Sequence, residues 1–151
     1  MSVQSVTPVL NVSSIGASLA WSEALGWKRR FSWNDGGMIC GATDTNEHGA
    51  AGFGSVCSGK AKIFLCCGVQ GVRGTILPKF PGDDATDGAW MSWWIKSPAD
   101  VDALHAVAVA NGMTVTYPPT TEPWGVREFH LRHPDGHMFR VGSGLSEDSA
   151  N

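Results

Sequence analysis

The chain has 151 residues, 42% of them hydrophobic and 17% charged, which is typical of a folded globular protein. A formal net charge of −3 offers no basic surface for phosphate groups, so a nucleic-acid partner is not expected. No stretch approaches the roughly 20 apolar residues of a membrane-spanning helix, and no basic flank precedes an apolar run near Met1. We therefore expect a cytoplasmic protein without membrane contact.

The four cysteines are Cys40, Cys57, Cys66 and Cys67. They are too few for a disulfide scaffold, and no pair has the spacing of a zinc knuckle. We expect buried free thiols in a reducing compartment.

The first half of the chain begins with a short apolar segment, Thr7–Val12, which predicts a strand. Ser13 and Ser14 are candidate N-caps of the following helix. The residues of its inner face recur at helical spacing: Ile15, Leu19 and Ser22 or Glu23. Gly26 ends this helix, and a second strand at Trp27–Trp33 leads to an Asn-Asp-Gly-Gly turn.

The second half repeats this scheme. Residues 90–95 predict a strand, and Ser97 with Pro98 predicts the start of a helix. The apolar face of that helix consists of Val101, Leu104, His105, Ala108 and Val109. Gly112 follows the helix, and Met113–Tyr117 predicts the next strand.

Corresponding positions of the two halves have nearly constant offsets. Val12 and Ile95 are 83 residues apart, and Gly26 and Gly112 are 86 apart. The repeat indicates an internal duplication in an α+β fold, with each half forming a βαβββ module. The expected single domain has a first module at about 5–70, a linker at about 71–88, a second module at about 89–142 and a flexible tail at 143–151.

Three segments resemble one protein family. They are TPVLNVSSIGASLAWSEALGW (7–27), AWMSWWIKSPADVDAL (89–104) and EPWGVREFHLRHPDGHMFRV (122–141). Their pattern is similar to the bleomycin-resistance proteins of the glyoxalase, or vicinal oxygen chelate, superfamily. The resemblance implies paired modules in a curved mixed sheet, a ligand cavity on its concave face, and a homodimer that shares its sites between subunits.

Metal-dependent members of this superfamily hold the ion with His or Glu in three strands. The matching positions here are Thr7, Trp90 and Arg140, none of which is a useful ligand. The fixed positive charge of Arg140 would repel a divalent ion. We expect neither a metal nor another cofactor.

Strand alternation sorts the side chains into a core set and a cavity set. The core set contains Leu10, Val12, Met91, Trp93, Ile95, Phe129, Leu131, Phe139 and Val141. The cavity set contains Thr7, Val9, Asn11, Trp90, Ser92, Trp94, Glu128, His130, Met138 and Arg140.

Histidines provide the remaining acid–base candidates. His130 is either a general acid–base group or a structural residue that bonds a carboxylate or lies at the rim, and we favour the structural role. His133 and His137 flank a Pro-Asp-Gly turn and are expected to be solvated.

The seven tryptophans fall into two groups. Trp21, Trp27 and Trp93 are expected in the core. Trp33, Trp90, Trp94 and Trp124 are expected to contact a ligand, because indole faces on a concave surface stack on planar rings and attract cations. Trp124 ranks first, because its Pro-Trp-Gly segment resembles the family's stacking tryptophan.

These observations favour a metal-free protein that binds and sequesters a planar small molecule, neutral or cationic, such as a bleomycin-type antibiotic. The expected ligand-binding residues are Asn11, Trp33, Trp90, Trp94, Trp124, His130 and Arg140. The alternative is a lyase or oxygenase of the same fold with an unusual site.

Overall fold

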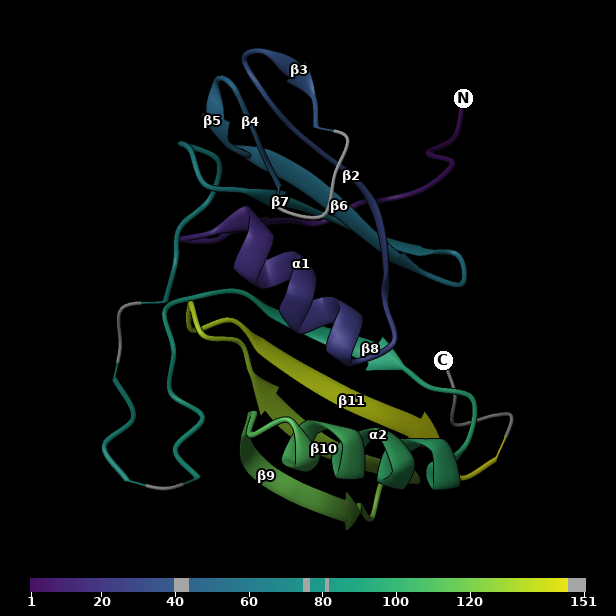
Figure 1. Cartoon of the computed structure of the whole chain (residues 1–151). Helices are drawn as coiled ribbons and strands as arrows, with labels where there is room; N and C mark the ends of the chain where they lie inside the picture. The colour runs from purple at the N-terminus through teal and green to yellow at the C-terminus, as the bar shows by residue number, and fades with distance from the viewer. Residues whose placement is uncertain (40–43, 75–76, 81, 147–151) are drawn as a thin grey trace. The chain divides into compact units, whose positions relative to one another are not determined.

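A computed structural model describes residues 1–39, 44–74, 77–80 and 82–146 (Figure 1). The chain forms two compact units, Met1–Arg73 and Gly74–Asn151, which are described separately below. The boundary falls inside the segment that the sequence predicts as a linker.

The first unit is a mixed sheet with one helix. Its elements are β1 (Val9–Asn11), α1 (Ile15–Ala24), β2 (Lys28–Asn34), β3 (Gly37–Met38), β4 (Thr45–Asn46), β5 (Gly49–Ala50), β6 (Phe53–Ser58) and β7 (Ala61–Cys66). The main sheet has the order β1-β7-β6-β2-β3, with β1 parallel to β7 and the other neighbours antiparallel. This order supplies the strand pairing that the sequence leaves open between residues 34 and 70.

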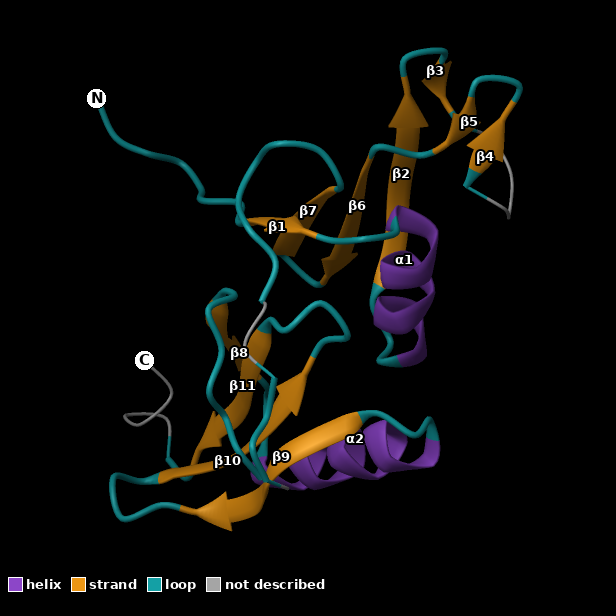
Figure 2. Cartoon of the chain, turned by 90° about the vertical axis from the view of Figure 1, so that its left-hand side faces the viewer, coloured by secondary structure: helices purple, strands orange, loops and turns teal. Residues whose placement is uncertain are grey.

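The second unit has the same plan without the small hairpins. Its elements are β8 (Trp90–Trp94), α2 (Pro98–Ala110), β9 (Thr114–Thr121), β10 (Val126–Arg132) and β11 (Met138–Gly144). The sheet order is β8-β11-β10-β9, with β8 parallel to β11, and α2 packs against one face of this sheet (Figure 2). The matching orders confirm the α+β fold of two βαβββ modules.

Both helices start and end where the sequence predicts. Ser14 caps α1 by accepting a hydrogen bond from the N–H of Ala17 at 3.2 Å, and Ser97 caps α2 in the same way. Gly26 and Gly112 follow the helices with φ of 87° and 67°, a region that favours glycine. Local backbone chemistry therefore sets both boundaries.

The buried face of α2 is narrower than predicted. Val101 and Ala108 are completely buried, but Val109 is exposed. Val101 and Ala108 are about two helical turns apart and therefore lie on the same side of the helix. Val109 is rotated by about 100° around the helix axis from Ala108 and points away from the buried side.

Strand β9 is longer than the predicted Met113–Tyr117 and continues through Pro118 and Pro119 to Thr121. The prolines are tolerated because β9 is the edge strand of its sheet, where one side of the backbone has no strand partner.

The linker lies against the turn between β10 and β11. The N–H of Gly74 donates to Asp135 O at 2.7 Å, and the N–H of Ala89, which follows the linker, donates to His137 Nδ1 at 3.0 Å. His133 and His137 are consequently buried, so the prediction that they are solvated is wrong. Burial is the main reason why the pKa of His133 falls to about 4.

Two smaller predictions also need correction. The predicted tail begins too early in the chain, because β11 continues to Gly144 and Ser143 is buried in it. Of the cysteines, Cys66 is a buried free thiol, whereas Cys57 and Cys67 are free but partly exposed, and Cys40 lies outside the described residues.

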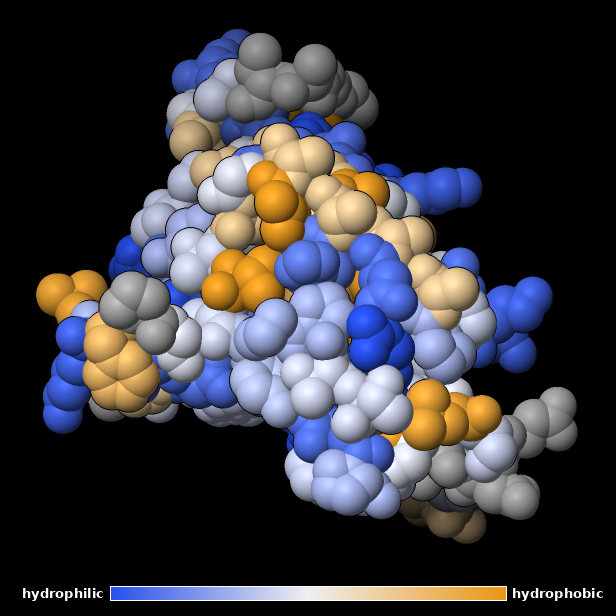
Figure 3. Space-filling model, turned by 90° about the horizontal axis from the view of Figure 1, so that it is seen from below, coloured by the Kyte–Doolittle hydropathy of each residue, from blue (hydrophilic) through white to orange (hydrophobic). Residues whose placement is uncertain are grey.

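The part of the chain that the structure describes contains no helix long and apolar enough to cross a membrane. The face seen from below shows hydrophobic residues in several groups set among hydrophilic ones (Figure 3).

Candidate ligand-binding site

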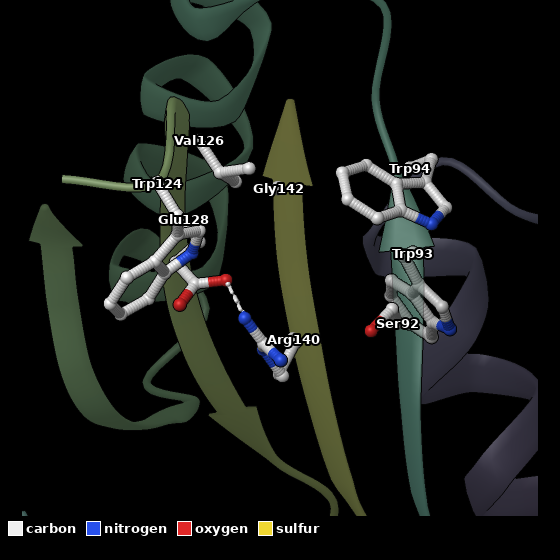
Figure 4. A pocket seen from close by; sticks show the side chains of 8 residues that line it. All are labelled: Ser92, Trp93, Trp94, Trp124, Val126, Glu128, Arg140 and Gly142. Atoms are coloured by element: carbon white, nitrogen blue, oxygen red, sulfur yellow. Dashed lines mark hydrogen bonds and ion pairs between the residues drawn. The ribbon is translucent and has the colours of Figure 1, made fainter. Parts of the chain in front are cut away.

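A pocket with an empty volume of about 380 Å³ lies on the sheet of the second unit (Figure 4). It is lined by Ser92, Trp93, Trp94, Trp124, Val126, Glu128, Arg140 and Gly142. Strands β8, β10 and β11 and the turn before β10 all contribute to it. Three of the predicted ligand-binding residues, Trp94, Trp124 and Arg140, therefore come together.

Two exposed indoles flank this pocket. Trp94, in β8, is 54% exposed, because strand alternation turns its neighbour Trp93 into the core instead. Trp93 stacks on Phe139, with ring centroids 4.4 Å apart. Figure 4 shows the rings of Trp94 and Trp124 on either side of β11, with Arg140 between them.

Trp124 is 60% exposed and sits in a tight turn between β9 and β10. The turn is closed by a hydrogen bond from Glu122 N–H to Val126 O at 2.7 Å. Gly125 has a φ of 82°, which favours glycine, and its N–H donates to Glu122 O. Backbone bonds thus fix the turn, and the indole is not needed to hold it.

An ion pair with one buried and one partly exposed partner forms the polar floor of the pocket. Arg140 donates from Nε and Nη2 to Glu128 Oε2, at 3.1 and 2.6 Å. The Glu128 side chain is 5% exposed and that of Arg140 is 42% exposed. Gly142 lies two residues further along β11 and leaves the space beside Arg140 free of a side chain.

His130 lies on the same strand as Glu128, two residues away, and does not line the pocket. Its Nδ1 is 2.7 Å from Asp84 Oδ2, which confirms the predicted bond to a carboxylate. Its Nε2 is buried, has no hydrogen-bond partner among the described residues and lies 3.8 Å from Glu128 Oε1. The indole of Trp90 contacts His130 edge-on, at 5.5 Å between ring centroids.

Asp84 is a partner of His130 that the sequence does not reveal, because it belongs to the predicted linker. Arg132 holds this segment by donating from Nη2 to the carbonyls of Asp83 and Ala85, at 2.8 and 3.0 Å. Thr116 adds a hydrogen bond to Asp84. The N–H groups of Lys79 and Ala85 donate to the Asp83 carboxylate and lower its pKa.

The sequence predicts that Met138 faces the cavity. The residue is instead completely buried and does not line the pocket. Its N–H donates to Ala89 O, at the end of the sheet where the linker is bonded to the β10–β11 turn. The linker therefore lies over this end of the sheet of the second unit.

The other two predicted residues belong to the first unit. Trp33 is exposed and lines an apolar pocket with Phe31, Met38 and Phe53, with an empty volume of about 520 Å³. Asn11 is buried and donates from Nδ2 to the carbonyls of Gly68 and Gln70, at 2.8 and 3.1 Å. Its amide fixes the chain after β7 and does not line either pocket.

Solved structures share this fold. TioX from Micromonospora sp. ML1 is 17% identical, with a TM-score of 0.64, over 93% of this chain and 100% of TioX. A fosfomycin resistance protein, FosX, from Listeria monocytogenes with Mn(II) and sulfate is 11% identical (TM-score 0.64), over 99% and 96% of the two chains. Lactoylglutathione lyase from Agrobacterium tumefaciens is 14% identical (TM-score 0.61), over 96% and 97%.

Comparison with curated protein sequences gave no significant match. The family model for the glyoxalase/bleomycin resistance protein/dioxygenase superfamily, by contrast, matches residues 4–141, which is most of the chain. The chain belongs to the glyoxalase/bleomycin resistance protein/dioxygenase superfamily.

Proposed function

We propose that this protein binds a planar small molecule between Trp94 and Trp124 and protects the cell by sequestering it, as expected for a bleomycin-type antibiotic. The observation that carries this proposal is the pair of indoles, more than half exposed, that flank a pocket with a charged floor. Large exposed aromatic side chains in a concave site are typical of ligand-binding surfaces.

Stacking supplies the affinity in this proposal. Each contact between an indole and a flat ring contributes about 0.5–1.5 kcal/mol beyond the area that it buries. The two stacking contacts and a charge-assisted hydrogen bond add to the free energy gained from burying the ligand's apolar area, and sequestration requires no chemical step.

A catalytic divalent metal does not fit the residues present. Of the three positions where metal-dependent relatives carry ligands, Trp90 and Arg140 cannot coordinate a cation, and Thr7 lies before β1. The carboxylate of Glu128, which lines the pocket, already accepts a hydrogen bond from Arg140 at 2.6 Å. Among residues 1–39, 44–74, 77–80 and 82–146 no three His, Cys, Asp or Glu side chains are grouped to hold a metal ion.

The alternative function, a lyase or oxygenase with an unusual site, is favoured by one observation. His130 is paired with Asp84 and keeps a buried Nε2 without a hydrogen-bond partner in the described chain, an arrangement that suits a general base. The binding function is preferred because Glu128, and not His130, lines the pocket.

A homodimer is part of the proposal. Both units carry exposed aromatic side chains on their sheets, with Trp33 in the first unit and Trp94 and Trp124 in the second. A second copy would cover such apolar groups in a two-fold arrangement.

The test is tryptophan fluorescence quenching with a panel of bleomycin-type, thiocoraline-like and mitomycin-like compounds. At least one compound should quench emission saturably in the wild-type protein and much less in the double variant Trp94→Phe, Trp124→Phe. If no compound binds, or if the double variant binds equally well, the site is not a sequestration pocket.

A further inference from the structure

We infer that the ligand of this pocket carries an acidic edge, a carboxylate or similar oxyanion, that binds Arg140. The inference rests on the proposed function and departs from the expectation from the sequence, which is a neutral or cationic ligand.

Arg140 is held in one orientation and still has donors to spare. A guanidinium group has five N–H donors. Two hydrogen bonds, from Nε and Nη2, go to Glu128 Oε2, and Nη1 has no hydrogen-bond partner among the described residues. The unused N–H groups belong to a side chain that is 42% exposed and lines the pocket.

The two charges of the pair are not equally accessible. The carboxylate of Glu128 is nearly buried, whereas the guanidinium of Arg140 reaches the pocket. A bound molecule therefore meets positive charge and N–H donors first. A cationic group at this place would meet the exposed guanidinium of Arg140 before the nearly buried carboxylate of Glu128.

The position of Arg140 between the two indoles sets the shape of the ligand (Figure 4). When a flat aromatic ring stacks on Trp94 or Trp124, a substituent on the edge of that ring points toward the guanidinium of Arg140. Arg binds carboxylates through planar, charge-assisted hydrogen bonds, which are about twice as strong as neutral ones. The geometry thus favours a planar aromatic acid over a planar aromatic amine.

Three probes with the same ring test this preference: naphthalene-2-carboxylate, naphthalene-2-carboxamide and 2-naphthylmethylammonium. Their dissociation constants are measured by calorimetry at low salt and neutral pH. The carboxylate should bind about ten-fold more tightly than the ammonium probe, with the amide between them. Equal or tighter binding of the ammonium probe overturns the inference but leaves the proposed function standing, whereas failure of all three probes contradicts the proposed function.

Two variants should shift the preference in opposite directions. Glu128→Gln keeps an acceptor for Arg140 but removes the compensating charge, so the ratio of carboxylate to ammonium affinity should rise several-fold. Arg140→Gln should bring this ratio to one or below while the amide probe still binds. A thermal melt of each variant shows that the fold is retained, which matters for Arg140→Gln because it leaves Glu128 buried without its partner. If Glu128→Gln leaves the ratio unchanged, Arg140 does not determine the charge of the ligand.

Discussion

The variant Trp124→Ala tests whether Trp124 contributes to ligand affinity or to the stability of the fold. With 60% of the residue exposed, the folded chain buries only about 100 Å² of the indole, which is worth at most about 2.5 kcal/mol of unfolding free energy. The turn itself is held by the backbone bonds between Glu122, Gly125 and Val126, which the substitution leaves in place. Affinity for a planar ligand should fall by about 1–3 kcal/mol, or one to two decades in dissociation constant.

The matched comparison is Trp93→Ala, which removes a buried indole stacked on Phe139. This change should cost about 3–5 kcal/mol of stability. Urea unfolding curves and ligand titrations are measured for both variants. A loss of stability for Trp124→Ala as large as that for Trp93→Ala, with unchanged affinity per folded molecule, would show that Trp124 is a packing residue.

Three further predictions concern pH, assembly and metal. His133 has a folded-state pKa of about 4, lowered by burial against the opposing effect of Asp135, so its neutral form stabilises the fold above pH 6.5. That contribution should decrease by about 2 kcal/mol between pH 7 and pH 5, and unfolding of His133→Gln should show a correspondingly weaker pH dependence. Light scattering should report a particle of twice the 16.0 kDa chain mass, and a 16.0 kDa particle at micromolar concentrations would contradict the dimer. Elemental analysis of untagged protein should find less than one Zn, Ni, Mn or Fe per chain, whereas stoichiometric metal would favour the enzyme.

Features fixed by neighbouring residues were predictable from the sequence. Ser14 and Ser97 cap their helices and Gly26 and Gly112 follow them, because capping and positive φ depend on a few adjacent residues. Alternation along β8 likewise placed Trp93 in the core and Trp94 on the surface.

Features that depend on distant segments were not predictable. His133 and His137 look like turn residues in solvent, but the linker bonds to their turn and buries them. Asp84 meets His130 only because Arg132 holds the linker carbonyls on either side of it. No pattern within the linker indicates these contacts, since each partner lies more than 40 residues away.

Under the proposed function, the absence of a side chain at Gly142 means that a single substitution could change which molecules the pocket accepts. A Cβ at this position would lie 3.2 Å from Val126 Cγ1 and 3.3 Å from Glu128 Cβ, so it would be tightly seated in the floor. Any larger side chain would have to grow into the space beside Trp94. Variation at one codon would thus make the pocket shallower while both indoles remain, with Val126 and Glu128 shifting slightly to admit the new Cβ. Homologues that bind smaller molecules are expected to differ first at this position.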